Sequence, residues 1–219
     1  MKAAALAVLL LACATASGED TTPPADPDDA GVMIREASLP EGFPAPGKIN
    51  EVVVKQYPAY RMAKVAAADV ETRGRRGQDG MFGVLFRHIK SHDIPMTAPV
   101  EMQYPTEPVE GDAAGTEAPA PAPVMMGFLY GAPSWGEAGR DGVVDVVDVP
   151  AMTVVSVGVR GGYTNERVAA AVEKLRAFIA DSGGKYEAAG PPRLLGYNSP
   201  FVPAFLRYGE VQVPVRVAP

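Results

Sequence analysis

Short runs in which apolar residues dominate or alternate with polar ones predict that most of the folded part consists of β-strands. These runs cover residues 51–56, 60–67, 98–104, 124–130, 143–149 and 152–159. A further run at the C-terminus is the most regular, because valine occupies every odd position from 211 to 217. Gln212, Pro214 and Arg216 alternate with these valines, which predicts one buried and one solvated face. Pro214 has no amide donor, so we expect it at a sheet edge or at an unpaired position.

Two segments have the apolar spacing of amphipathic helices. The stronger is predicted over residues 166–181, with Thr164 as N-cap and Gly183 as stop signal. Its apolar stripe consists of Val168, Val172, Leu175 and Ile179, and we expect it to lie on a sheet. The weaker helix is predicted over residues 79–88, with a stripe formed by Phe82, Leu85, Phe86 and Ile89.

The order of these elements predicts the fold class. Strands, a helix and further strands are followed by a second set of strands, helix and strands. This order favours an α+β fold with two similar halves over parallel βαβ units. With 219 residues, 47% of them hydrophobic and 21% charged, the chain can bury one sizeable core, which favours a single domain.

Charge is distributed unevenly along the chain. Residues 13–47 contain seven acidic residues and one basic residue, and residues 105–123 contain four acidic residues and no basic one. The remainder from residue 48 onward has 18 basic and 15 acidic residues, although the whole chain has a net charge of -6. The net acidity argues against a generic nucleic-acid binder, which would be drawn to phosphates by positive charge.

The N-terminus has the pattern of an export signal. Lys2 is followed by a ten-residue apolar run to Ala12, which is too short to span a bilayer. Two processing sites are compatible with it. Residues 10–13 resemble a bacterial lipobox, which would make residues 1–12 the signal and lipidate Cys13, whereas Ala14-Thr-Ala16 is a cleavage site that would release residues 1–16. We favour an exported cell-envelope lipoprotein, with a secreted or periplasmic soluble protein as the alternative, so any membrane contact would come from the lipid anchor.

Two biased segments flank or interrupt the predicted domain. Residues 13–47 are acidic and rich in proline, so they are predicted to be a disordered linker between a lipid and a folded domain. Residues 105–123 are a low-complexity stretch between two predicted strands, and we interpret it as a surface loop.

Motifs for common enzymatic chemistry are absent from the sequence, and two candidate clusters are interpreted as structural. His88 and His92, with Asp93 adjacent, would share a face and could chelate a metal if the helix continued through residue 91. Pro95 follows closely, so we expect the helix not to continue through Ser91. Asp145 and Asp148 are predicted to lie on opposite faces of a strand, where they cannot cooperate.

Several motifs together resemble the SOUL haem-binding protein family. The segment Phe86-Arg-His-Ile-Lys90, followed by Ile94-Pro-Met-Thr-Ala-Pro-Val100, is similar to the family's "YI…I-x-MTAPV" signature. Further similar blocks are residues 54–60 for the first hairpin, residues 149–154 and the following helix for the second half, and residues 195–201 with 205–211 for the C-terminal "YNPPF…F-x-RRNEV". The resemblance covers residues 48–217.

The resemblance implies a distorted antiparallel β-barrel of about eight strands flanked by two α-helices, within a domain spanning residues 48–219. It also implies non-covalent binding of haem or another tetrapyrrole without enzymatic turnover. Such a ligand needs an apolar cleft with a basic rim, and residues 61–90 have a local charge of +4. The residues expected to line that cleft are Arg61, Met62, Lys64, Arg75, Arg76, Phe82, Phe86 and Met96.

Departures from the family pattern leave other functions open. Gln56 stands where some members have a histidine assigned to the iron, so His88 becomes the candidate iron ligand, although a core substitution for an aromatic residue is the simpler explanation of His88. Glu210 suggests a small-molecule-binding domain of the effector-binding type, or an enzyme that uses this carboxylate as a general base. A protein-interaction or lipid-surface scaffold is the third alternative.

Overall fold

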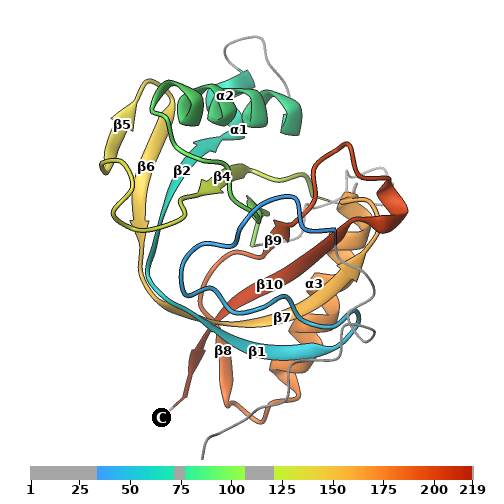
Figure 1. Cartoon of the computed structure of the whole chain (residues 1–219). Coiled ribbons are helices and arrows are strands. Elements are labelled where there is room, and N and C mark those ends of the chain that lie inside the picture. The colour runs from blue at the N-terminus through green and yellow to red at the C-terminus, as the bar shows by residue number, and fades with distance from the viewer. Residues whose placement is uncertain (1–33, 72–76, 107–120, 219) are drawn as a thin grey trace, which may run out of the picture.

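The computed structural model describes residues 34–71, 77–106 and 121–218, whose path is shown in Figure 1. Cys13, Arg75, Arg76 and most of the insertion at residues 105–123 lie outside these described ranges. The elements, in chain order, are β1 (Val52–Tyr57), β2 (Tyr60–Ala66), α1 (Ala67–Glu71), α2 (Gly77–Ser91), β3 (Val100–Gln103), β4 (Met125–Leu129), β5 (Gly139–Asp141), β6 (Val144–Val149), β7 (Met152–Arg160), α3 (Asn165–Ala180), β8 (Tyr186–Ala188), β9 (Arg193–Gly196), the 3₁₀ helix η1 (Ala204–Leu206) and β10 (Tyr208–Val217).

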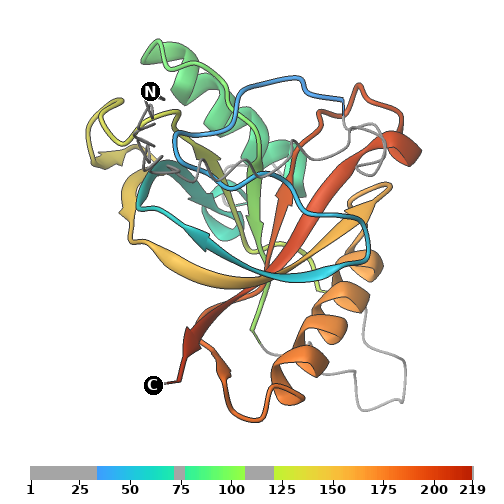
Figure 2. The same cartoon turned by 60° about the horizontal axis from the view of Figure 1, so that its bottom comes forward.

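One curled antiparallel sheet forms the body of the molecule, which confirms the α+β class. The strand order is β1-β7-β10-β9-β3-β4-β2-β6-β5, and β8 pairs with β10 beside β9. The sheet does not close into a barrel within the described residues, since β1 and β5 are the ends of the order. The sheet is strongly curled (Figure 2), in agreement with the expected distorted barrel, but in the described residues it stays open and has ten strands in place of about eight. The additional strands β5, β8 and β9 have only three or four residues each, too few to produce a recognisable alternation.

The sheet consists of two halves with the same arrangement. In one half β2 leads through α2 to β3 and β4, and in the other β7 leads through α3 to β9 and β10. The sheet order within the halves is β2-β4-β3 and β7-β10-β9, and the halves meet where β3 pairs with β9. Each half gains one outer strand from the other part of the chain, because β1 pairs with β7 and β6 pairs with β2.

The main hydrophobic core lies between the sheet and its helices. Helix α2 packs on β2, β4 and β6, and helix α3 packs on β7, β8 and β10. Met81, Leu85 and Ile89 of α2 are almost fully buried, and so are Val168 and Leu175 of α3. We call this side of the sheet the helix face. Burying a side chain of this kind contributes about 1.5–3 kcal/mol, so the two apolar stripes are sufficient reason for the helices to dock.

The helix termini agree with the sequence for α3 and differ from it for α2. Thr164 caps α3 as predicted, with its side-chain oxygen accepting from the amide of Arg167 at 3.3 Å. Helix α2 runs to Ser91 and not to residue 88, so the expectation that the helix would not continue through Ser91 was wrong. The chain leaves the helix at Asp93, whose φ of 54° is left-handed. None of the helices in the described ranges has the length and apolarity needed to cross a membrane.

Strand β10 differs from the prediction on one of its faces. Val211, Val213 and Val215 are buried on the helix face, as expected. The other face was predicted to be solvated, which is correct for the exposed Arg216 but wrong for Gln212, since Gln212 and Glu210 are fully buried on that face. Groups that cover this face explain the difference, since the amide of Gly47 donates to Glu210, and Gln212 is hydrogen-bonded to Tyr57 and Arg193. On one edge of β10, Pro214 lies outside both ladders, between the residues that pair with β9 and those that pair with β8, while on the other edge it is in register with Val154 of β7.

Candidate functional site

A buried network of polar side chains lies on the sheet face opposite the helices, which we call the open face. Its central members are Tyr57 of β1, Tyr60 of β2, Glu101 of β3, Arg193 of β9, and Glu210 and Gln212 of β10. Each of these residues is at most 3% exposed. Buried charges are tolerated only when they are paired and hydrogen-bonded, so their partners define the chemistry of this face.

Glu210 is fully engaged at one end of the network. Its Oε1 accepts hydrogen bonds from the amide of Gly47 at 2.7 Å and from Nζ of Lys55. Its Oε2 accepts from the hydroxyl of Tyr197 at 2.9 Å. The side chain of Lys55 is only 9% exposed and also donates to the carbonyl of Ala45 at 2.8 Å. The carboxylate therefore has a buried positive partner and no exposed surface.

Glu101 has a similar cationic partner at the other end. Its Oε2 accepts from Nη1 of Arg193 and from the hydroxyl of Tyr60, both at 3.0 Å. Nε of Arg193 donates to the side-chain oxygen of Gln212 at 3.0 Å, and Nε2 of Gln212 donates to the hydroxyl of Tyr57 at 2.8 Å. Gln212 thus joins the two ends into one continuous network, in which the register of β3, β9 and β10 brings the members together.

The pKa values of the tyrosines and of Arg193 in this network are all raised. Burial raises the pKa of Tyr57, Tyr60 and Tyr197, and the adjacent carboxylates of Glu210 and Glu101 raise it further. Burial alone would lower the pKa of Arg193, but Glu101 and the tyrosine hydroxyls outweigh that effect and raise it. At neutral pH the tyrosine hydroxyls are therefore protonated donors.

The N-terminal segment 34–47 covers the Glu210 end of the open face. The ring of Phe43 lies edge-on between Tyr57, at 5.0 Å, and Tyr60, at 5.2 Å. In Figure 1 this segment is the blue part of the chain, crossing in front of the sheet. These residues were predicted to belong to the linker, but they pack on the domain, because Phe43 supplies an apolar anchor within the proline-rich sequence.

A cleft of about 530 Å³ opens beside the Glu101 end, within the 300–1,000 Å³ usual for small-molecule sites. Its polar lining includes Lys64, Glu101, Gln103 and Arg193. Its apolar lining includes Met62, Val147, Val149, Pro150, Met152, Pro191 and Pro214. The β6–β7 turn and the segment between β8 and β9 thus supply most of the apolar surface, and the polar network forms part of the floor.

Lys64 is the cation that this cleft leaves available. Arg193 is held by Glu101, Tyr60 and Gln212, as described above. Lys64 lies on the same face of β2 as Tyr60, two positions further than Met62, and makes no hydrogen bond or ion pair to other residues of the described ranges. An anionic group bound in the cleft would find one free ammonium group there.

Arg61, predicted for the same rim, lies on the other face of β2. Its Nε and Nη2 donate to the carboxylate of Asp148 at 2.7 and 3.0 Å, and Nη1 donates to the carbonyl of Gly136 at 2.7 Å. The hydrogen bond to Asp148 raises the pKa of Arg61, and the same bond lowers the pKa of Asp148. Arg61 is therefore committed to a structural contact.

The aromatic residues and methionines predicted to line the cleft do not all lie on the same face of the sheet. Phe82 packs against Phe128 of the core on the helix face, and its ring stacks on that of Phe86, which is 39% exposed. Met96 is half-buried against the same core. Only Met62 and Lys64 of the predicted ligand residues line the open-face cleft, so the eight candidates do not form a single site in the described part of the chain.

His88 is buried and its two ring nitrogens both have partners. Nδ1 is 2.8 Å from Oδ2 of Asp141 and Nε2 is 3.1 Å from the hydroxyl of Tyr130. It lines a second cavity, of about 470 Å³, together with Arg87 and Ser91. Helix α2 lies on the helix face, so His88 is not positioned to contact a ligand in the open-face cleft.

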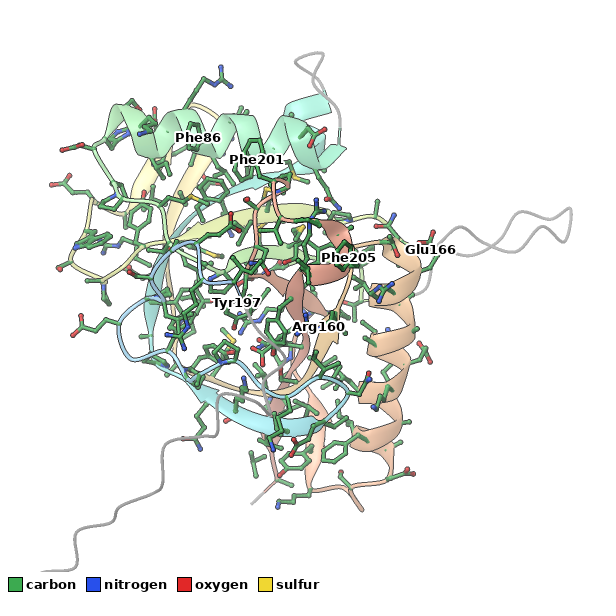
Figure 3. The ribbon with its side chains drawn as sticks, turned by 45° about the vertical axis from the view of Figure 1, so that its right-hand side comes forward. Phe86, Arg160, Glu166, Tyr197, Phe201 and Phe205 are labelled. Carbon is green, nitrogen blue, oxygen red and sulfur yellow. The ribbon has the colours of Figure 1, made fainter. Side chains whose placement is uncertain are left out.

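Aromatic side chains are also exposed away from the cleft. Phe201, on the loop after β9, and Phe205, in η1, are 95% and 72% exposed. Figure 3 shows Phe205 toward the N-terminal end of α3, where Glu166 is labelled, whereas Tyr197 lies among the crowded side chains of the domain. These two rings therefore belong to the outer surface and not to the polar network.

The profile of the SOUL heme-binding protein family matches residues 47–214. The chain belongs to the SOUL family. The match includes the polar network and the cleft, and the family as a whole is described as heme-binding. No curated protein matches the chain.

Several solved structures are similar to this SOUL chain at low sequence identity. The C-terminal domain of EcmrR is 15% identical with a TM-score of 0.51, and the alignment covers 77% of this chain and 98% of that domain. EcmrR in a complex with DNA gives a TM-score of 0.54 at 14% identity, where this chain spans only 58% of the EcmrR chain. A hydrolase from Listeria innocua is 12% identical with a TM-score of 0.50 and coverages of 77% and 93%. At these identities the likeness shows the fold alone.

Sequence reasoning missed most of the open-face network. Glu101, Arg193 and Gln212 come from three strands, and their proximity depends on strand register that the sequence does not state. One available signal was the position of Arg193 and Gln212 among buried apolar residues of their strands. Glu210 was singled out, but as an accessible acid, whereas the SOUL chain encloses it with Lys55.

Proposed function

We propose that this chain binds haem or a related tetrapyrrole non-covalently in the open-face cleft, without enzymatic turnover. The observation that carries the proposal is the apolar cleft next to the available ammonium group of Lys64. A tetrapyrrole is a flat apolar ring with carboxylate side chains, so its site needs an apolar lining and a cation near the opening. Membership of the SOUL family is independent support.

The lining residues fit the periphery of such a ring better than its metal. The chain has two histidines, and both lie on α2 or directly after it, on the helix face. The cleft offers thioether sulfurs, of Met62 and Met152, and no imidazole. We therefore propose that shape, apolar contact and Lys64 hold the ligand, and that a histidine–iron bond is not required.

Binding of haemin and of metal-free protoporphyrin to the full chain tests this proposal. We expect saturable one-to-one binding of both, with dissociation constants within about threefold of each other, because the cleft supplies no imidazole to favour the iron form. Absorbance in the Soret region and quenching of porphyrin fluorescence would measure the two. Changes no larger than those with an unrelated control protein would refute the proposal, and binding of haemin alone would refute its iron-independence.

The alternative functions find less support in the described residues. A general base or a site for cationic ligands at Glu210 requires an accessible carboxylate, whereas Glu210 is fully buried and paired with Lys55. Opening that end would require the segment around Phe43 to leave the face. The proposed function therefore uses Glu210 as a structural residue.

We also propose that the protein is exported and anchored through Cys13. The proposal rests on the sequence of residues 1–13, which lie outside the described ranges. Expression of the full chain and of its Cys13→Ser variant in a bacterial host with labelled palmitate tests it. We expect the label and the membrane fraction to depend on Cys13, and label on neither form would support the ordinary cleavage site instead.

A further inference from the structure

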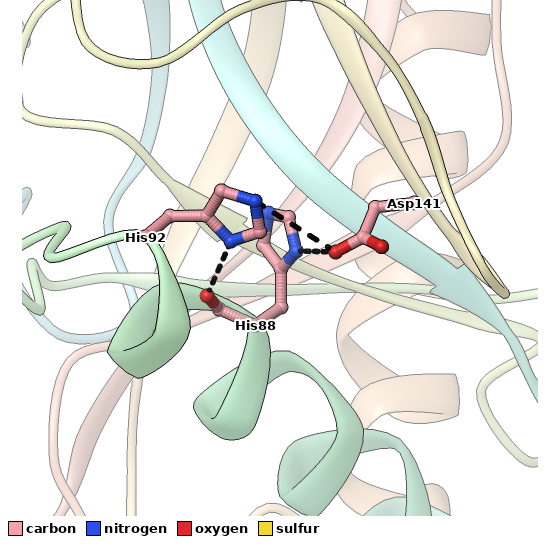
Figure 4. Close-up of side chains that lie close together, drawn as sticks. All are labelled: His88, His92 and Asp141. Carbon is pink, nitrogen blue, oxygen red and sulfur yellow. Dashed lines mark hydrogen bonds and ion pairs between the residues drawn. The ribbon is translucent and has the colours of Figure 1, made fainter.

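Three potential metal ligands converge at the end of α2, two from neighbouring turns of the chain there and one from a distant strand. His88 and His92 are one helical turn apart, and Asp141 comes from the exposed strand β5 (Figure 4). One ligand atom of each residue lies within 4.8 Å of the others. The sequence suggested Asp93 as the acidic member, but the fold brings Asp141 to the pair. This cluster is on the helix face and has no part in the proposed tetrapyrrole site.

The hydrogen bonds of His92 leave one nitrogen free to coordinate. Its Nδ1 is 2.9 Å from the backbone carbonyl of His88. A carbonyl can only accept, so in the neutral ring Nδ1 carries the hydrogen and Nε2 carries the lone pair. Nε2 faces Asp141, with 3.9 Å between it and Oδ2. A backbone carbonyl that fixes the tautomer in this way is the usual outer support of a metal-binding histidine.

His88 has an equivalent support from Tyr130. The hydroxyl of Tyr130 lies 3.1 Å from Nε2, and Nδ1 lies 2.8 Å from Oδ2 of Asp141. If Nε2 carries the hydrogen and donates it to Tyr130, the lone pair of Nδ1 points toward the carboxylate. Two electron-rich atoms at that separation need a cation between or beside them, and either a proton or a metal ion can fill that role.

We propose that Nδ1 of His88, Nε2 of His92 and Oδ2 of Asp141 bind a divalent first-row cation of the Zn²⁺ class. Two imidazoles and one carboxylate, with a remaining open position, are a common ligand set for such ions. Binding displaces the proton shared by His88 and Asp141, which is released to solvent. In a tetrahedral site, metal–ligand bonds of about 2.0–2.2 Å place ligand atoms about 3.4 Å apart. The half-exposed ring of His92 therefore has to move closer to Asp141, and the 2.8 Å between His88 and Asp141 has to widen slightly.

The open coordination position would face the 470 Å³ cavity that His88 and Asp141 line. Arg87 and Ser91 line the same cavity. A water molecule or a small anion is the fourth ligand that these neighbours suit, because Arg87 adds positive charge beside the metal. The site therefore has the composition of an accessible metal centre and not of a closed structural one.

Zn²⁺ titration of the full, tag-free chain by calorimetry tests the proposal. All proteins would contain Cys13→Ser, so that no thiol competes. We expect one Zn²⁺ per chain at pH 7.5, at least tenfold weaker binding for His92→Ala and for Asp141→Asn, and no change for Asp93→Asn. Asp93→Asn is the matched control, because it removes an acid next to His92 and asparagine accepts the left-handed backbone found there. Affinity should fall at pH 5.5, where protons compete for the imidazoles.

Absence of saturable binding, or equal binding by Asp141→Asn and the parent, would overturn the proposal. A Co²⁺ spectrum of the folded parent gives a second measurement that does not depend on variants. Visible bands typical of nitrogen and oxygen ligation would support the site, and a spectrum identical to that of aqueous Co²⁺ would contradict it. Circular dichroism of each variant would show that loss of binding is not loss of folding.

Discussion

The two buried carboxylates of the open face have similar partners and different surroundings. Glu210 is paired with Lys55 beneath the segment that carries Phe43, and every oxygen is occupied by a donor of the chain. Glu101 is paired with Arg193, but this pair forms part of the floor of a cleft. A buried charge is therefore not by itself a site. The cavity beside it, and an additional cation such as Lys64, are what distinguish the Glu101 end.

The largest effect is expected from raising the pH, because it acts on both ends at once. Burial raises the pKa of seven of the eight tyrosines. It raises the pKa of Tyr104 and of Tyr163 to about 12, and the pKa of the tyrosines beside Glu210 and Glu101 is raised by the carboxylate as well. Above pH 10 the unfolded chain releases phenol protons that the folded chain retains. The contribution of the tyrosines to the free energy of unfolding is therefore fully present below pH 10. It falls as the pH rises above 10, by up to about 1.4 kcal/mol per pH unit for each such tyrosine.

Urea unfolding between pH 8 and 11.5, with phenolate absorbance recorded in parallel, measures this effect. Phenolate should form together with unfolding, and Tyr197→Phe should reduce the slope of stability against pH by about one proton. If the phenols of the folded chain ionised near pH 10 without unfolding, the buried network as described would be wrong.

Removing one partner of the Glu101 pair should have the next largest effect. Arg193→Leu leaves a buried carboxylate without its cation, so the free energy of unfolding should fall by about 3–5 kcal/mol. Arg140→Leu is the control, since the Arg140 side chain is 62% exposed and its ion pair with Asp145 is long, at 3.9 Å. This variant should change the free energy of unfolding by less than about 0.5 kcal/mol. Urea denaturation at pH 7 measures both.

A double variant sharpens this result. Glu101→Leu combined with Arg193→Leu removes both charges and should recover part of the loss. Equal stability of the single variant and the parent would mean that the pair is hydrated and does not form the dry floor described here.

A smaller and more local effect is expected at the Glu210 end. Phe43→Ala removes two edge-on aromatic contacts and should cost about 1–2 kcal/mol. It should also speed hydrogen exchange of the Gly47 amide, which donates to Glu210. Phe86→Ala, on the exposed side of α2, is the matched control and should leave that amide protected. Unchanged exchange in Phe43→Ala would show that this ring does not hold the covering segment in place.

The fold could be predicted from the sequence because its signals are local. The apolar stripes of α2 and α3 and the alternation of β10 follow from side-chain periodicity, and Thr164 is a recognisable cap. The open barrel and the strands β5, β8 and β9 could not be predicted, since they depend on pairing between distant, short segments.

The candidate site was predictable in part. Met62 and Lys64 were named together with Arg61, although the alternation of a strand places Arg61 on the other face. The partners of Glu101 and Glu210 depend on the register of β3, β9 and β10, and Asp141 reaches His88 only through the packing of β5 beside α2. Such contacts between distant parts of the chain have no signature in a single sequence.

Charge reversal at two positions on opposite faces of β2 tests most directly where the ligand binds. Lys64→Glu places a negative charge in the open-face cleft, and Arg61→Glu places one on the opposite face of the same strand. The account predicts that metal-free protoporphyrin binds at least about tenfold more weakly to Lys64→Glu and within about twofold of the parent to Arg61→Glu, in a fluorescence-quenching titration. Unchanged binding by Lys64→Glu, or a larger loss in Arg61→Glu, would contradict it.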